Sequence, residues 1–98
     1  MGLSVTERGF LDKMIDKEIA QIPSHVRRCR DPQTKAKFQL KEPDDFVFGI
    51  AFGSIMSDFT TYHSMIYNRS LTQEEMEEAV SVINKRMVEI RNAIFNCG

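Results

Sequence analysis

The sequence predicts an all-α protein of three helices, at about residues 5–22, 43–67 and 72–96. Apolar residues recur at spacings of three and four in each segment, which is the period of a helix with one buried face. Residues typical of helix starts precede or open all three segments. The chain has 98 residues, 42% hydrophobic and 28% charged, so we expect one folded helical domain over residues 1–98.

The first predicted helix begins after Ser4. Ser4 and Glu7 have the spacing of a capping box, in which each side chain hydrogen-bonds the backbone N–H of the other. Apolar residues then follow the helical period as far as Ile22. Pro23 lacks a backbone N–H and clashes with the preceding turn, so we expect the helix to end there.

Residues 23–42 are predicted to be a connector, because prolines punctuate them and the helical period is missing. This connector is also basic, and its basic residues are Arg27, Arg28, Arg30, Lys35, Lys37 and Lys41. They are a candidate contact surface for an anion or a nucleic-acid backbone. A solvated basic loop is one alternative. Another is pairing with the acidic part of the chain, since residues 43–98 carry eight acidic and four basic side chains.

The second predicted helix begins at Pro43, which suits the first helical turn. Its apolar residues keep a heptad spacing that indicates a continuous buried seam. The seam residues are Phe48, Phe52, Ile55, Phe59, Tyr62 and Ile66. The alternation of large and small residues over 46–53 leaves a strand as the alternative, but no other segment offers such a strand a partner.

This second helix is apolar nearly all round, and a helix of that kind needs to be buried. Two further helices are too few to enclose it, so we expect a homodimer with this helix near the two-fold axis. Small residues at four-residue spacing let another helix approach closely. The candidate interface comprises Phe48, Gly49, Phe52, Gly53, Met56 and Phe59.

The third predicted helix begins with a second capping box, formed by Thr72 and Glu75. Its apolar residues keep the same heptad spacing as those of the second helix. Only a short turn at residues 68–70 separates the two helices, so they are predicted to form a long antiparallel hairpin.

Two cysteines, Cys29 and Cys97, are too few for a disulfide framework. The longest apolar run is too short to span a bilayer, and no cationic segment precedes an apolar run at the N-terminus. We therefore expect a cytoplasmic protein with reduced thiols and no membrane span. Three arginines surround Cys29 in the sequence, which favours a lowered pKa of its thiol.

Asp58, Tyr62 and His63 form the only group of side chains suited to proton transfer, because they lie within about a turn and a half of the second helix. The spacings typical of zinc sites and phosphate-binding loops are missing. We therefore expect no catalytic residue, cofactor or metal.

The sequence thus favours a non-catalytic interaction or regulatory module that acts as a homodimer. Binding of a different protein is a further option that the sequence leaves open. Nucleic-acid binding through the basic segment at 27–41 is the second interpretation. An enzyme or ligand-binding protein that uses Asp58 and His63 is the third.

Overall fold

The computed structural model describes residues 2–96, so Cys97 lies outside the described residues. They form five helices: α1 (Val5–Arg30), α2 (Pro32–Phe38), α3 (Pro43–Tyr67), α4 (Gln73–Lys85) and α5 (Met87–Phe95). The described part of the chain contains no strand, which confirms the all-α prediction. The predicted number of three helices is wrong.

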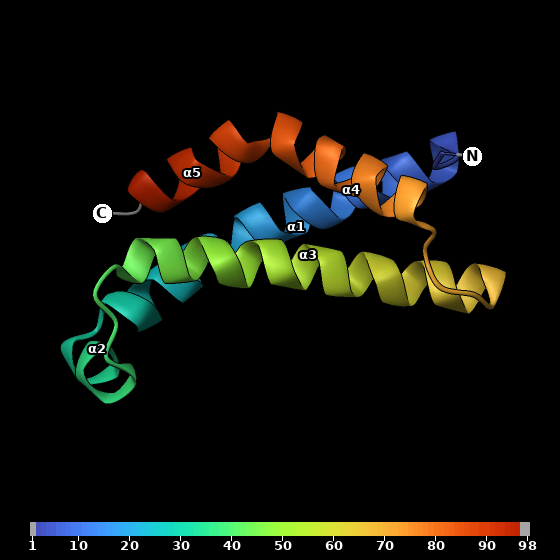
Figure 1. Cartoon of the computed structure of the whole chain (residues 1–98). Coiled ribbons are helices and arrows are strands. Elements are labelled where there is room, and N and C mark those ends of the chain that lie inside the picture. The colour runs from blue at the N-terminus through green and yellow to red at the C-terminus, as the bar shows by residue number, and fades with distance from the viewer. Residues whose placement is uncertain (1, 97–98) are drawn as a thin grey trace.

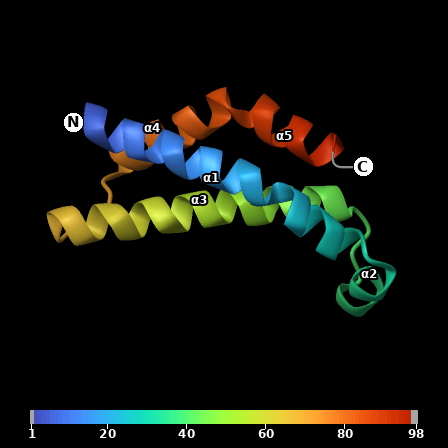
Figure 2. The same cartoon turned by 180° about the vertical axis from the view of Figure 1, so that it is seen from behind.

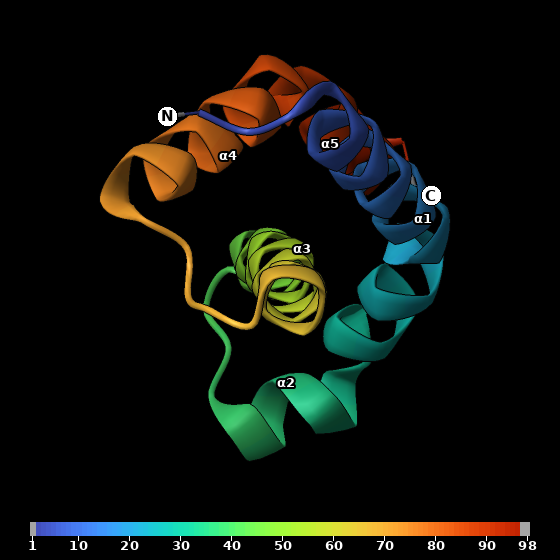
Figure 3. The same cartoon turned by 90° about the vertical axis from the view of Figure 1, so that its right-hand side faces the viewer.

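Helix α3 lies at the centre of the arrangement. It runs antiparallel to α1, while α4 and α5 return along it in the direction of α1 (Figures 1 and 2). Viewed along α3, the other four helices form an arc around it and leave one side uncovered (Figure 3). The most extensive helix pairing is that of α1 with α3. The long antiparallel hairpin predicted for residues 43–96 stays a prediction.

The first helix continues through Pro23 to Arg30, so the predicted end at residue 22 is wrong. A proline inside a helix costs about 3 kcal/mol or more, because one hydrogen bond is lost and the ring crowds the previous turn. The residues beyond it repay this cost, since Val26 and Cys29 are buried on the same face as Ile22. Tertiary packing therefore overrides the local signal that Pro23 provides.

The predicted connector at 23–42 is mostly helical. Its first part belongs to α1, and α2 follows after Asp31, whose carboxylate accepts a hydrogen bond from the Thr34 N–H at 3.2 Å. Helix α2 ends where Gln39 takes a left-handed conformation with φ 55°. None of the residues of α2 is buried, which is why no apolar period revealed it in the sequence.

The predicted bounds of the central helix, 43–67, are confirmed, and the strand alternative for its first part is wrong. The buried residues follow a four-residue spacing instead of the heptad, and they are Val47, Ala51, Ile55, Phe59 and His63. A row of that spacing is inclined to the helix axis, as in helices that pack at an angle. The far end of the predicted seam is therefore exposed, and Ile66 has 58% of its surface accessible.

The predicted helix at 72–96 is broken at Arg86, which separates α4 from α5. Arg86 has φ −106° and ψ 10°, and its N–H donates to the Ile83 carbonyl at 3.0 Å in a tightened turn. Its guanidinium donates to the Asp12 carbonyl at 3.0 Å and pairs with Asp16, both on α1. The break turns α5 so that Ile90 and Ile94 are buried.

A continuous apolar core joins α1, α3, α4 and α5. Its largest fully buried apolar side chains include Leu11, Ile15, Ile55, Phe59 and Ile83. Among the described helices, none combines the length and the apolar character required to cross a membrane.

The buried row of α3 differs from the predicted heptad seam, and this difference leads to a stability prediction. Phe59→Ala removes a fully buried ring and should lower the free energy of unfolding by about 3–5 kcal/mol. Ile66→Ala is the matched control, because the heptad prediction placed both residues on the seam, and it should change stability by less than about 1 kcal/mol. Urea denaturation of both variants measures the difference. Equal losses would show that the heptad face is the buried one.

Candidate functional site

The N-termini of α1 and α4 each carry a buried glutamate, although the capping residues Ser4 and Thr72 are exposed. In α1, the Ser4 hydroxyl accepts a hydrogen bond from the Glu7 N–H at 3.1 Å, and the Glu7 carboxylate accepts one from the Ser4 N–H at 3.2 Å. In α4, Thr72 and Glu75 make the same reciprocal pair at 3.1 and 2.9 Å. Both capping boxes predicted from the sequence are therefore confirmed.

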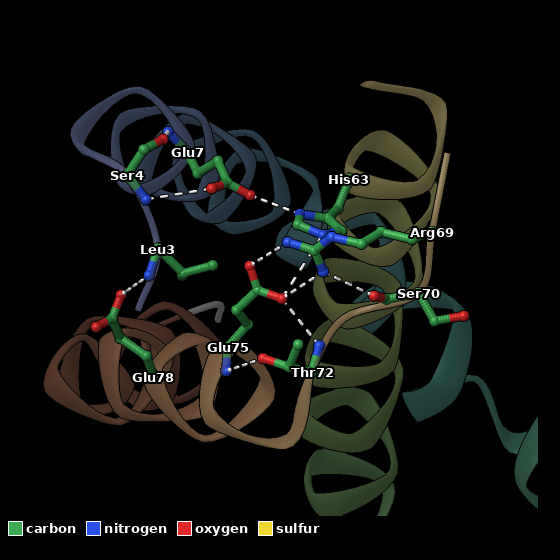
Figure 4. Close-up of polar contacts among 9 residues, drawn as sticks. All are labelled: Leu3, Ser4, Glu7, His63, Arg69, Ser70, Thr72, Glu75 and Glu78. Carbon is green, nitrogen blue, oxygen red and sulfur yellow. Dashed lines mark hydrogen bonds and ion pairs between the residues drawn. The ribbon is translucent and has the colours of Figure 1, made fainter. Parts of the chain in front are cut away.

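The side chain of His63 lies between these two carboxylates (Figure 4). Its Nδ1 is 2.6 Å from Oε2 of Glu7, and its Nε2 is 3.7 Å from Oε1 of Glu75. His63 is fully buried, and the two glutamates are each 4% exposed. The short contact joins Nδ1 to the Glu7 carboxyl in a buried hydrogen bond. Nε2 faces the second carboxylate without a hydrogen bond of its own.

Arg69, in the turn after α3, holds the second carboxylate from the solvent side. Its guanidinium donates to both oxygens of Glu75, at 2.8 and 3.0 Å. These hydrogen bonds from Arg69, together with the Thr72 backbone N–H, lower the pKa of Glu75 from 4.5 to about 2. A bidentate pair of this kind is both strong and directional.

The cluster of Glu7, His63, Glu75 and Arg69 connects α1, α3, the following turn and α4. Arg69 balances the charge of the buried Glu75 carboxylate through a bidentate ion pair. Removing one partner from a buried pair costs more than the pair itself contributes, because the remaining charge is left without compensation. The cluster therefore orients three helix ends relative to one another.

Glu7, His63 and Glu75 also place one ligand atom each within 4.8 Å of one another. Carboxylates and an imidazole are ordinary ligands for zinc. Both oxygens of Glu75, however, already accept hydrogen bonds from Arg69. Glu75 is therefore already engaged by a cation, and the arrangement fits a hydrogen-bonded polar cluster better than a metal centre.

The structure separates Asp58 and Tyr62 from His63. Asp58 is exposed beside Lys13 and Lys17, and it lines an open surface cavity of about 390 Å³. The ring of Tyr62 stacks on that of Phe10, with centroids 3.7 Å apart. Five residues along a helix correspond to about 140° around its axis, so Asp58 and His63 point in different directions. The predicted proton-transfer group is therefore not assembled.

Five of the six predicted basic contact residues are exposed, at the end of α1, on α2 and in the loop that follows. Arg30 differs from them, since it makes a bidentate pair with Asp44 at 2.9 and 3.0 Å and donates to the Ile94 carbonyl at 3.2 Å. The expected lowering of the Cys29 thiol pKa is wrong. Cys29 is buried, and this burial raises the pKa of its thiol more than Arg28 lowers it.

The predicted interface residues lie on two faces of α3. Phe59 is fully buried in its own chain and is not accessible to a partner. Gly49 and Gly53 are exposed on the uncovered side. The other three are half-buried, namely Phe48, Phe52 and Met56. The ring of Phe48 is covered by the Arg91 guanidinium, 4.0 Å from its centroid.

Comparisons of the chain with protein-family models, with curated proteins and with solved structures gave no match. The glutamates beside His63 were not predicted as its partners, although both capping boxes were recognised. A capping box identifies where a helix starts, but only the tertiary fold shows that two such starts converge.

The lowered pKa of Glu75 predicts how stability depends on pH. A carboxyl whose pKa is lower in the folded state stabilises fully above its unfolded value, here 4.5, and loses this contribution as the pH falls towards 2. Arg69→Ala should lower the free energy of unfolding at pH 6, and by progressively less as the pH falls below 4.5. Urea denaturation at pH 6, 4 and 3 measures this change.

Lys85→Ala is the control for that series, because Lys85 has no ion-pair partner among the described residues. Its effect should be small at every pH. If Arg69→Ala destabilised the protein equally at pH 6 and pH 3, the pairing of Arg69 with Glu75 would not control the stability of the cluster.

Proposed function

We propose that this protein is a non-catalytic interaction module that binds a second copy of itself through the uncovered side of α3. The observation that carries the proposal is the row Gly49, Gly53 and Ser57, which is exposed along the most apolar helix of the chain. A Cβ atom added to Gly49 or Gly53 would meet no other group within 4 Å. The row therefore has no packing role inside the single chain.

The composition of this side of α3 supports an interface. Each glycine in a helix costs about 1 kcal/mol relative to alanine, and no close packing within residues 2–96 of the single chain offsets this loss at Gly49 or Gly53. Residues 46–57 carry no charged side chain, and the half-buried Phe52 and Met56 lie in the same stretch. Small residues at four-residue spacing allow two helix backbones to approach closely, with their larger neighbours packing on either side.

A second copy is the partner that this surface suits. In an antiparallel pairing of two α3 helices centred on Gly53, Gly49 of each copy lies opposite Ser57 of the other. In the same register, Asp45 lies opposite Thr61 and Asp58 opposite Phe48, so no two acidic residues face each other. An isologous pairing of this kind closes on itself as a two-fold dimer, which is the commonest assembly of soluble proteins.

The buried cluster supports a non-catalytic role. His63, the residue best suited to proton transfer, is fully buried and is engaged by Glu7. A general base has to come within hydrogen-bond reach of the proton it removes, and no substrate group reaches His63 in this arrangement.

Sedimentation equilibrium of the wild type and of Gly53→Leu tests the proposal. The wild type should be a dimer at micromolar concentration. The leucine side chain projects from the uncovered side, where it should keep two helices apart and weaken dimerisation roughly 10- to 100-fold. The fold of the single chain should be unaffected, because the new side chain has free space around it.

Gly9→Leu is the matched control, because Gly9 is also exposed, also helical and also free of neighbours within 4 Å. It brings the same gain in helix propensity but lies on α1, and it should leave the dimer intact. A wild type that stays monomeric at hundreds of micromolar, or equal effects of the two substitutions, would contradict the proposal.

A further inference from the structure

We propose that the corner formed by the end of α1, by α2 and by the start of α3 binds single-stranded nucleic acid. In this proposal, one base occupies a pocket with aromatic walls, and the neighbouring phosphates contact the surrounding basic side chains. The site borders the glycine row of α3, because Phe46 and Ile50, which line it, lie within about a turn of Gly49 and Gly53 on the same helix. Binding at this site does not require dimerisation.

The pocket lies between the three helices and has a volume of about 200 Å³. Phe38 of α2 and Phe46 of α3 line it, and they remain 62% and 46% exposed. Pockets for drug-sized ligands measure roughly 300–1,000 Å³, so this one suits a single flat ring system. His25, Arg28 and Thr34 also line it. Arg28 supplies its guanidinium for the edge of a base, while His25 Nε2 lies 3.5 Å from Glu18 Oε1 and the Thr34 hydroxyl donates to Asp31.

The basic residues around the pocket are not used by the fold. Within residues 2–96, no ion pair forms to Arg27, Arg28, Lys35, Lys37 or Lys41. The remaining arginines are all paired with acidic side chains, and they are Arg8, Arg30, Arg69, Arg86 and Arg91. The nearby Asp31 carboxylate is engaged in capping α2. The charge of the corner is therefore available to a polyanion.

The spacing along α2 places these charges beside the aromatic wall. Thr34 and Phe38 are four residues apart and both line the pocket. Lys35 and Lys37 fall between them in the sequence, so on a helix they lie on either side of that row. Lys41 follows in the loop before α3. A strand whose base enters the pocket would thus have its phosphates close to cations on both sides.

Stacking surfaces combined with cations favour a single strand over the other polyanions. A base has a free face for stacking only when it is not paired and stacked in a duplex, and proteins that bind single strands combine these two features. An acyl chain from a membrane would cover the Arg28 guanidinium without offering it a hydrogen-bond partner. The chain as a whole has a net charge of −1 and does not attract a polyanion, so the attraction has to come from a local basic surface such as this corner.

Fluorescence anisotropy with a labelled 20-nucleotide oligothymidine tests the proposal. Each phosphate contact with a single strand contributes about −0.7 to the slope of log affinity against log salt. Three to five contacts should therefore weaken binding by about 20- to 100-fold between 50 and 200 mM salt. Phe38→Ala should weaken it by roughly 5- to 100-fold, the loss typical of one stacked base.

Two matched controls separate this site from general effects. Phe95→Ala removes a ring that is 64% exposed on α5, close to the 62% of Phe38, and should leave binding unchanged. Lys35→Ala with Lys37→Ala should reduce both the affinity and its salt dependence. Lys13→Ala with Lys17→Ala, which removes the same charge from exposed positions of α1, should reduce neither.

Several results would overturn the proposal. One is no binding of the oligonucleotide at 50 mM salt. Another is equal effects of the variants and their controls. Tighter binding to a duplex of the same length would also do so. A parallel arm with vesicles of phosphatidylserine and phosphatidylcholine identifies an anionic membrane as the target if only the vesicles bind and Phe38→Ala reduces that binding.

Discussion

The architecture follows from the need to bury α3, which is apolar nearly all round, with few neighbouring elements. Helix α1 supplies most of the cover, and it does so by continuing through Pro23 so that Val26 and Cys29 join the core. The break at Arg86 turns α5 towards the same core. Even so, one side of α3 stays uncovered, as Figure 3 shows. Burial of α3 thus explains why α1 continues through Pro23 and why the last helix breaks at Arg86. The side of α3 that stays uncovered is the surface proposed to bind a second copy.

The polar cluster around His63 orients helix ends at the other end of the bundle. The N-termini of α1 and α4 converge there on the last turns of α3, and each brings a carboxylate from its capping box. His63 forms a hydrogen bond with the first carboxyl, and the Arg69 guanidinium donates to the second. Because such hydrogen bonds are directional, the cluster fixes the relative orientation of helix ends that apolar packing alone would leave free to slide.

Local signals in the sequence predicted the helical class, both capping boxes and the bounds of α3. They failed where tertiary contacts decide the outcome. Pro23 predicts a helix end, but burial of Val26 and Cys29 stabilises the helix beyond it. Residues 72–96 keep a heptad spacing through Arg86, yet the ion pair with Asp16 on α1 accompanies a break there. The partners of His63 were unpredictable for the same reason, since Glu7 and Glu75 are far from it in sequence. Arg30 belongs to the basic segment in the sequence, but in the fold it forms an ion pair with Asp44 and so has a structural role.

The chain therefore presents two different surfaces, an uncharged row of small residues on α3 and a basic corner with exposed rings. We propose that the first is an interface between two copies. Isotope-filtered NMR on a mixture of labelled and unlabelled protein detects such an interface, because only contacts between copies give a signal. We expect intermolecular contacts between Gly49 of one copy and Ser57 of the other. Intermolecular contacts confined to other surfaces, or none at millimolar concentration, would contradict it.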